Sequence, residues 1–258
     1  MDDLSADVES LVRELGQPPV LVGASLGGIS ALAALGRNPD LALGVVLVDV
    51  SPFVQPEGTR RIREFMTAHP EGFATLDDVA DTVARYLPHR GRSANVSGLR
   101  RNLRQVEGRW YWHWDPAFMR VPVDQPVIRD TLLDPVRLGA AAASLRLPTP
   151  LIRGEHSDVL SKADPRRFLR LVPHAEFAEI SGAYHMVAGD DNSGFFTVTA
   201  QFLDRRIRSR LDALAPASDS ALPAARVVPT TKPGCECWSS TPRDRRGQGW
   251  TAEAAGPS

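Results

Sequence analysis

A serine set between glycines is the residue in this sequence best placed to act as a nucleophile. The run Gly23-Ala24-Ser25-Leu26-Gly27 follows an apolar stretch at residues 19–22 and precedes a helical pattern. A G-x-S-x-G turn between a strand and a helix is typical of a nucleophile elbow, in which the serine hydroxyl stands clear of the sheet. We expect Gly23 and Gly27 to provide the room that this tight turn needs. The predicted chemistry is attack of the Ser25 hydroxyl on a carbonyl carbon.

A nucleophilic serine needs a histidine base and an acid that orients the histidine, in the chain order serine, acid, histidine. Asp158 follows an apolar run at residues 150–154, and His185 follows another at residues 175–180. Residues of the required types thus lie after successive expected strands and in the required order. The sequence predicts His185 as the base and Asp158 as the orienting acid.

Other residues compete for two of these roles. Asp49 stands near the end of the apolar run at residues 43–50 and is the alternative acid, while Glu155 is a weaker third candidate. His156 and His113 are expected to pack or to face solvent. The backbone N–H of Leu26, beside the nucleophile and near a helix N-terminus, is the predicted oxyanion donor.

The elements that must position these residues follow from apolar periodicity. Apolar residues recur at helical spacing in residues 4–15, and a second helix is expected from about residue 27. The run at residues 43–50 is apolar throughout, as in a parallel strand buried on both faces. The resulting order, β-α-β, an insertion, then β-α-β-α, predicts an α/β fold with a mostly parallel sheet flanked by helices.

The insertion and the C-terminal end differ from this pattern. We expect a core of residues 1–52 and 148–214, with a helical cap formed by residues 53–147. Helical patterns lie at 60–68, 76–86 and 134–145, without a convincing buried strand. Aromatic residues gather at 109–116, and we expect them to pack inside the cap, although one or two rings lining an apolar substrate pocket is the alternative. Residues 215–258 are rich in Pro, Ala, Ser, Thr and Arg without periodicity, which predicts a disordered tail.

Composition excludes several classes of partner. The chain has 258 residues, 30 Lys and Arg against 31 Asp and Glu, and 43% hydrophobic residues. Balanced charge gives no reason to expect nucleic acid or an acidic membrane surface. No apolar run has the length of a membrane span, and the acidic start is unlike a secretory signal. Two cysteines, Cys235 and Cys237, are too few for a disulfide framework or a full zinc site, so we expect a cytoplasmic protein. The predicted chemistry requires no metal or cofactor.

Taken together, the motifs resemble those of the α/β-hydrolase fold superfamily, and most closely its capped serine hydrolases, a group with esterases, epoxide-hydrolase-like proteins and non-haem peroxidases. The segments that carry the resemblance are residues 22–28, 47–52, 154–160 and 182–192. The resemblance implies a cap over the site and hydrolysis of an ester, thioester or related carbonyl compound. A serine at position 25 argues against the epoxide hydrolases and haloalkane dehalogenases of this fold, which use an aspartate nucleophile. The cap suggests a small apolar substrate.

The sequence differs from members of this group in the segment before the nucleophile elbow. Members carry about four more strands before the helix that precedes the elbow, and a loop after the third of them supplies a second oxyanion N–H. The strand at 19–22 would then leave one sheet edge bare, so we expect possible self-association through that edge. The alternative to an active hydrolase is an impaired, hydrolase-like binding module.

Overall fold

The structure is a computed structural model that describes residues 2–115 and 133–214. The tail expected at residues 215–258 lies outside the described residues, as do both cysteines. A parallel sheet carries the fold, with strands β1 (Val20–Ala24), β2 (Gly44–Val48), β5 (Pro150–Gly154) and β6 (Glu176–Ile180) in the order β1-β2-β5-β6. Adjacent strands pair in parallel throughout. The carboxyl ends of parallel strands meet at one edge of a sheet, so this edge collects the residues that follow β1, β2, β5 and β6.

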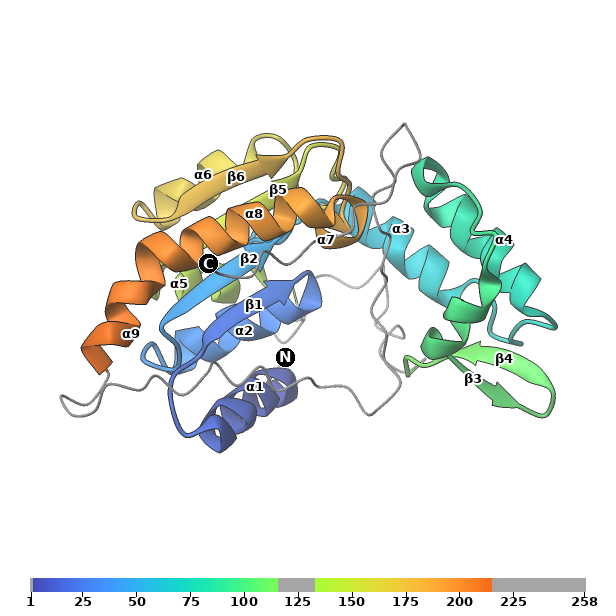
Figure 1. The fold of residues 1–258 in the computed structure, drawn as a ribbon, viewed down its shortest axis with the longest axis horizontal. Helices are drawn as coiled ribbons and strands as arrows, with labels where there is room; N and C mark the ends of the chain where they lie inside the picture. The colour runs from blue at the N-terminus through green and yellow to red at the C-terminus, as the bar shows by residue number, and fades with distance from the viewer. Residues whose placement is uncertain (1, 116–132, 215–258) are drawn as a thin grey trace, which may run out of the picture. The chain divides into compact units, whose positions relative to one another are not determined.

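Helices bury both faces of this sheet (Figure 1). One face packs under α1 (Asp2–Leu15), α2 (Leu26–Arg37), α5 (Pro135–Ser144) and α6 (Asp164–Leu171). The other face lies under α8 (Asn192–Phe202) and the π-helix η4 (Leu203–Ile207) that follows it, which bury Phe202 and Ile207. Along β2 the side chains alternate between the two faces, since Val45 and Leu47 join the first cluster and Val46 and Val48 the second. This period-2 pattern in an all-apolar strand confirms the predicted parallel strand buried on both faces.

The segment between β2 and β5 holds a small unit with its own apolar cluster. It contains α3 (Pro56–Thr67), α4 (Leu76–Tyr86), the short 3₁₀ helices η1 (Pro88–Arg90) and η2 (Val96–Asn102), and strands β3 (Leu103–Val106) and β4 (Arg109–Trp112). Phe73, Val79, Leu103 and Trp112 form its buried centre. We call this unit, residues 56–112, the cap.

Two expectations about the insertion are corrected by the structure. The cap is not purely helical, because β3 and β4 form an antiparallel hairpin. Its turn residues, Glu107 and Gly108, both have positive φ, as the tight turn of a two-residue hairpin requires. Helix α5, which we expected in the cap, instead packs on α2, where a Cβ on Gly36 would lie 2.5 Å from the Ala141 side chain. The helix therefore belongs to the core.

Strand β1 has β2 as its neighbour on one side and, within residues 2–115 and 133–214, no strand on the other. Val22 on this strand is 51% exposed, and Leu11 and Leu15 on α1 are also exposed. Three large apolar side chains in these two elements thus remain in contact with solvent.

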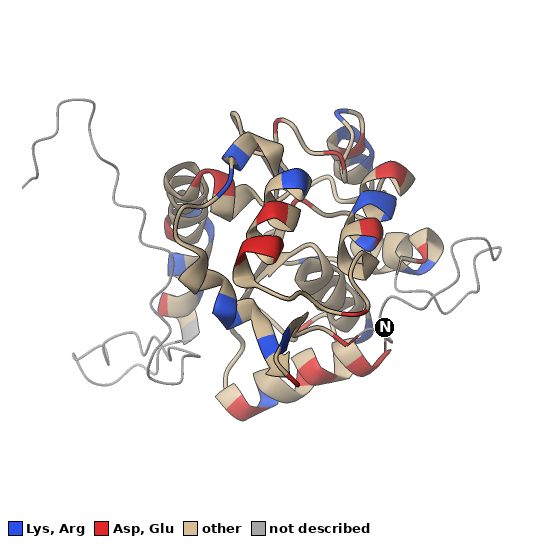
Figure 2. Ribbon diagram, turned by 90° about the vertical axis from the view of Figure 1, so that its right-hand side faces the viewer, with Lys and Arg blue, Asp and Glu red and all other residues tan. Residues whose placement is uncertain are grey.

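Charged residues of both signs lie side by side on the helices that face the viewer in Figure 2. This mixture agrees with the balanced composition and shows no field of one sign on that side. Among the described helices, none combines the length and the apolar character that a membrane crossing needs.

Candidate active site

Ser25 occupies a strained turn between β1 and α2. Its backbone has φ 48° and ψ −119°, a conformation that L-residues rarely adopt. Its N–H donates to the carbonyl of Val48 at 3.1 Å, which extends the β1–β2 ladder by one residue. Ser25 is thus held at the carboxyl edge of the sheet by a hydrogen bond from the neighbouring strand.

Close packing between Gly23 and Gly28 makes this turn possible. A Cβ on Gly23 would lie 2.5 Å from the backbone of Gly28, and one on Gly28 would lie 2.8 Å from the carbonyl oxygen of Gly23. Gly27, which we expected to provide this room, has open space within 4 Å of the position its Cβ would take. Gly28 replaces Gly27 as the steric partner of Gly23.

His185 contacts both Ser25 and a carboxylate. Its Nε2 lies 3.1 Å from Ser25 Oγ, and its Nδ1 lies 2.7 Å from Oδ2 of Asp49. The side chain of His185 is 10% exposed and that of Asp49 is fully buried. Because a carboxylate only accepts hydrogen bonds, Nδ1 carries the proton, and in the neutral ring Nε2 is left to accept the Ser25 hydroxyl proton.

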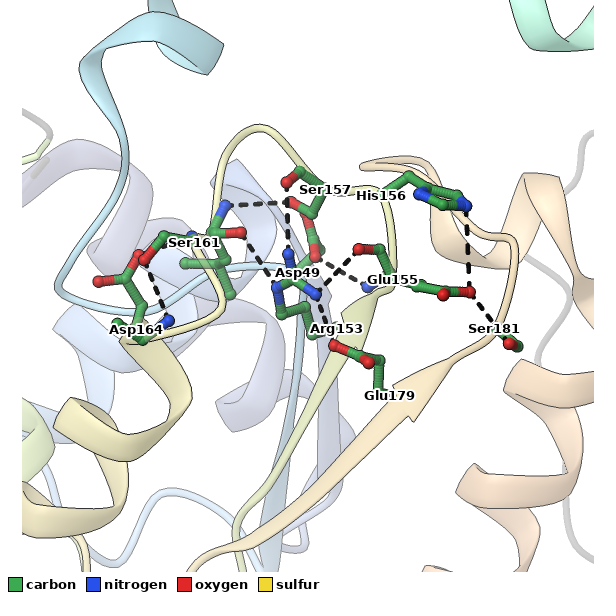
Figure 3. Close-up of polar contacts among 12 residues, drawn as sticks. Asp49, Arg153, Glu155, His156, Ser157, Ser161, Asp164, Glu179 and Ser181 are labelled. Atoms are coloured by element: carbon green, nitrogen blue, oxygen red, sulfur yellow. Dashed lines mark hydrogen bonds and ion pairs between the residues drawn. The ribbon is translucent and has the colours of Figure 1, made fainter.

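Three donors converge on the Asp49 carboxylate. Besides His185, the N–H of Gly154 donates to Oδ1 at 3.0 Å and the hydroxyl of Ser157 donates to Oδ2 at 2.5 Å. Figure 3 shows Ser157 above Asp49, on the loop that follows β5. Ser157 Oγ itself accepts from the N–H groups of Val159 and Leu160, so its proton is directed at Asp49. The orientation of the carboxylate that meets His185 is therefore set by the β5 strand end and the loop after it.

Asp158, the predicted orienting acid, does not meet His185, and this expectation is corrected. Its Oδ2 accepts instead from Nε of Arg61 on α3 at 2.5 Å. Arg61 also donates to the carbonyl of Tyr86 and lies over the Tyr86 ring. A Cβ on Gly58 would lie 2.4 Å from the carbonyl oxygen of Asp158, so α3 packs directly against this loop. Asp158 joins the core to the cap, and Asp49, the alternative acid, takes the place beside His185.

Glu155, the third candidate acid, holds the turn before the histidine. It accepts from the N–H of Gly182 and the hydroxyl of Ser181, and these hydrogen bonds lower the pKa of Glu155 below its usual value. Of the two histidines set aside, His156 donates its backbone N–H to Ala183, and His113 donates its own to Asn102 in the cap region. None of these groups contacts Ser25.

Leu26 is the first residue of α2. The first N–H groups of a helix have no intrahelical acceptor and carry the positive end of the helix dipole. The N–H of Leu26 therefore lies next to Ser25 at the positive end of α2, and its role as an oxyanion donor stays a prediction.

The aromatic run at 109–116 packs in the cap as far as the structure describes it. Trp112 is buried and stacks on Trp114 with ring centroids 4.6 Å apart, and Phe65 and Phe73 contact Trp112. Residue 116 lies outside the described part. In residues 2–115 and 133–214, no group of three or more His, Cys, Asp or Glu is arranged to hold a metal ion.

Sequence reasoning missed Ser157. Its only signal was its position, since it follows the expected strand at 150–154 by three residues, one residue before the acid that we favoured. A hydroxyl three residues after a strand can reach the end of a neighbouring strand, but the sequence does not indicate which strand that is.

Fold and motif together define the class to which this chain belongs. It is a member of the alpha/beta hydrolase family, whose family model matches residues 1–233. The chain is 27% identical over 207 residues to the sn-1-specific diacylglycerol lipase ABHD11 of Mus musculus, a match that covers 78% of this chain and 64% of the lipase. It is 28% identical over 217 residues to Esterase Rv0045c of Mycobacterium tuberculosis, covering 78% of this chain and 66% of the esterase.

Solved structures share the fold. A crystal structure of Esterase Rv0045c superposes with a TM-score of 0.59 at 28% identity, covering 78% of this chain and 66% of that one. A crystal structure of E-2-(acetamidomethylene)succinate hydrolase gives a TM-score of 0.63 at 22% identity, covering 78% and 72%. The chain thus spans about two thirds of the length of the lipase ABHD11 and of Esterase Rv0045c.

Proposed function

We propose that this chain is a serine hydrolase that cleaves a small ester, thioester or related carbonyl compound through Ser25, His185 and Asp49. The observation that carries the proposal is the position of His185, with Nε2 at 3.1 Å from Ser25 Oγ and Nδ1 at 2.7 Å from Asp49. Nucleophile, base and orienting acid within hydrogen-bond reach of one another are the geometric mark of this chemistry. Membership of a family whose relatives include a lipase and an esterase supports the same assignment.

In the first half-reaction, Ser25 Oγ bonds to the carbonyl carbon while His185 Nε2 takes the hydroxyl proton. Asp49 stabilises the imidazolium and keeps its ring oriented. The N–H of Leu26 donates to the oxyanion of the tetrahedral intermediate. When the intermediate collapses, the bond to the leaving alcohol or thiol breaks, and the leaving group takes the proton from His185.

The second half-reaction regenerates the serine. Water gives its proton to His185 Nε2 and attacks the acyl carbon, and the bond to Ser25 Oγ then breaks as Oγ recovers the proton. The carboxylic acid leaves. Each half-reaction uses the same three side chains, so no further co-reactant is needed.

The cap has an apolar, aromatic centre, and the charges on the helices in Figure 2 are of both signs, which supports a small, apolar substrate over one with a large net charge. An ester of a short acyl chain is therefore a suitable first probe. Turnover of a p-nitrophenyl ester by the wild type should fall by about 10³-fold or more in Ser25→Ala and in His185→Ala. Equal turnover in the wild type and in folded Ser25→Ala would contradict the proposal.

A second candidate is a binding module that has the same three site residues but little turnover. The unpaired edge of β1 among the described residues favours it, because a loop beyond that edge could supply a further oxyanion donor in larger relatives. Loss of one such donor costs about 10²–10³ in rate. Binding of a substrate analogue without detectable acylation of Ser25 would select this candidate.

A further inference from the structure

One group outside the three proposed catalytic residues connects the cap to the histidine segment. Asp190 ends α7 (Val187–Asp190), five residues after His185, and its side chain is only 4% exposed. Its Oδ2 accepts from the backbone N–H of Tyr184 at 2.8 Å. Its Oδ1 accepts from Nε of Arg90 at 2.7 Å and from Nε2 of His89 at 2.9 Å. A nearly buried carboxylate thus joins the residue before His185 to the 3₁₀ helix η1 of the cap.

The same cap helix also holds the residue after His185. Arg90 Nη2 donates to the carbonyl of Met186 at 3.3 Å. The His89 ring stacks on the ring of Tyr184, with centroids 3.7 Å apart and an interplanar angle of 10°. A Cβ on Gly189 would lie 2.6 Å from Arg90 Nη2, so the guanidinium is seated against the α7 backbone. Both chain neighbours of His185 are therefore bound by His89 and Arg90, directly or through Asp190.

His185 needs this support because its ring must meet two partners at once. A displacement of about 1 Å at a catalytic group can cost about 10²-fold in rate. Helix α7 is a single short turn. The core forms hydrogen bonds with the backbone of this segment at Gly182 and Ala183, which both precede Tyr184. Beyond residue 183 the core holds the segment by packing, since Val187 is buried in the second apolar cluster and the Tyr184 ring lies near His156. The side-chain hydrogen bonds to the backbone on both sides of His185 come from Asp190 and Arg90.

We propose that Asp190 and Arg90 are positioning residues that make the placement of His185 depend on docking of η1 from the cap. The proposal rests on the proposed function, since it concerns the base of that reaction. It implies that release of η1 from Asp190 loosens the backbone on either side of His185, so the alignment of His185 with Ser25 depends on docking of the cap. Asp190 and Arg90 act through the backbone on either side of His185 and not through contact with substrate.

The test uses Asp190→Asn and Arg90→Ala, with Arg90→Lys as the conservative variant and Asp191→Asn as the matched control. Asp191 is the neighbouring acid, and it accepts from the N–H of Gly194 at the start of α8. With a p-nitrophenyl ester, kcat should fall about 10- to 100-fold in Asp190→Asn and Arg90→Ala while KM changes little, because the defect lies in the position of the base. Arg90→Lys should recover part of kcat, and Asp191→Asn should keep it.

A proton NMR measurement makes the result independent of turnover. The proton on His185 Nδ1, hydrogen bonded to buried Asp49, should give a strongly downfield signal, assigned by its absence in His185→Ala. We expect this signal to be lost or shifted in Asp190→Asn and kept in Asp191→Asn. An unchanged signal and unchanged kcat in folded Asp190→Asn or Arg90→Ala would overturn the inference. A wild type with the signal but no turnover would count against the proposed function alone, and loss of that signal in the variants would still support the positioning role.

Discussion

Asp49 Oδ2 lies 2.7 Å from His185 Nδ1, although the two residues are separated by 136 positions in the chain. The carboxylate reaches the ring from the end of β2, one strand away from the loop that carries Asp158. Asp49 is therefore the acid that contacts the histidine, whereas Asp158 contacts Arg61 of the cap.

Exchange of each acid for its amide should distinguish their roles. In Asp49→Asn the amide no longer fixes the Nδ1–H tautomer of His185, and kcat should fall by about 10⁴-fold. Asp158→Asn, the control, loses only an ion pair with Arg61 and should keep kcat within about 10-fold of the wild type. Steady-state kinetics of the two variants provides the measurement. A larger loss in Asp158→Asn than in Asp49→Asn would reverse our assignment.

Ser157 should matter because it supplies one of the donors to buried Asp49. Ser157→Ala leaves a buried carboxylate oxygen with one donor fewer, which should lower the free energy of unfolding by about 1–3 kcal/mol and reduce kcat. Ser161→Ala is the matched control, since Ser161 Oγ accepts only from the N–H of Ala163 among its described contacts. Urea unfolding and ester turnover of both variants give the comparison, and equal stability would show that the Ser157 hydroxyl contributes nothing to the site.

The glycines of the elbow should tolerate alanine very differently. Gly23→Ala places a methyl group 2.5 Å from the backbone of Gly28, which cannot move without displacing α2. We expect a cost of about 1–3 kcal/mol, as for other overpacked cores. Gly27→Ala meets no atom within 4 Å and exchanges a helical glycine for alanine, which should stabilise the fold by up to about 1 kcal/mol. Thermal melts test both, and equal melting temperatures would show that the close approach of Gly23 and Gly28 is not maintained.

Asp190 should make stability depend on acid pH. Burial alone would raise the pKa of Asp190, but hydrogen bonds from His89, Arg90 and the Tyr184 N–H outweigh it and hold that pKa below the usual value. A group whose pKa is lower in the folded state stabilises the fold above its unfolded pKa, about 4, and this contribution disappears as the pH falls through the folded pKa.

The wild type should therefore lose more unfolding free energy than Asp190→Asn between about pH 5 and the acid limit of folding. Urea unfolding at a series of pH values measures the difference. Parallel curves for the two proteins would contradict a lowered pKa for Asp190.

The edge of β1 that has no strand partner among residues 2–115 and 133–214 motivates a prediction of self-association. Exposed strand edges offer unpaired backbone groups to another chain, and a lysine on such a strand discourages pairing. We expect the wild type to form oligomers with increasing concentration, and Val22→Lys to reduce them. Val136→Lys is the control, because Val136 is an exposed valine on helix α5 and not on a strand. Sedimentation velocity provides the readout, and a monomeric wild type with a sharp, cooperative melt would refute the prediction.

The sequence predicted the four strands of the parallel sheet and the places of Ser25 and His185 after two of them, because these depend on local signals. A continuous apolar run marks a buried parallel strand, and a glycine-flanked serine marks a strained turn. The choice between Asp49 and Asp158 depends on long-range packing, since both follow strands. Packing in the folded chain determines the choice, because Gly58 allows α3 to approach the Asp158 backbone and Arg61 on the same helix binds the Asp158 carboxylate.

The hairpin was missed, and α5 was predicted as a helix but assigned to the cap, for a related reason. Strands β3 and β4 are four residues each and carry charged residues, so alternation is hard to recognise, although the Glu107-Gly108 turn was a usable signal. Helix α5 has an ordinary amphipathic pattern, and only its packing against Gly36 shows that it belongs to the core.

Covalent labelling of Ser25 by a fluorophosphonate tests the central claim most directly, because the probe reacts with a serine only when a neighbouring base activates it. The account predicts one labelled peptide, containing Ser25, by mass spectrometry of the folded wild type. It also predicts loss of the label in Ser25→Ala and much slower labelling in His185→Ala and Asp49→Asn. A folded wild type that takes no label, or one labelled at the same rate after Asp49→Asn, would contradict it.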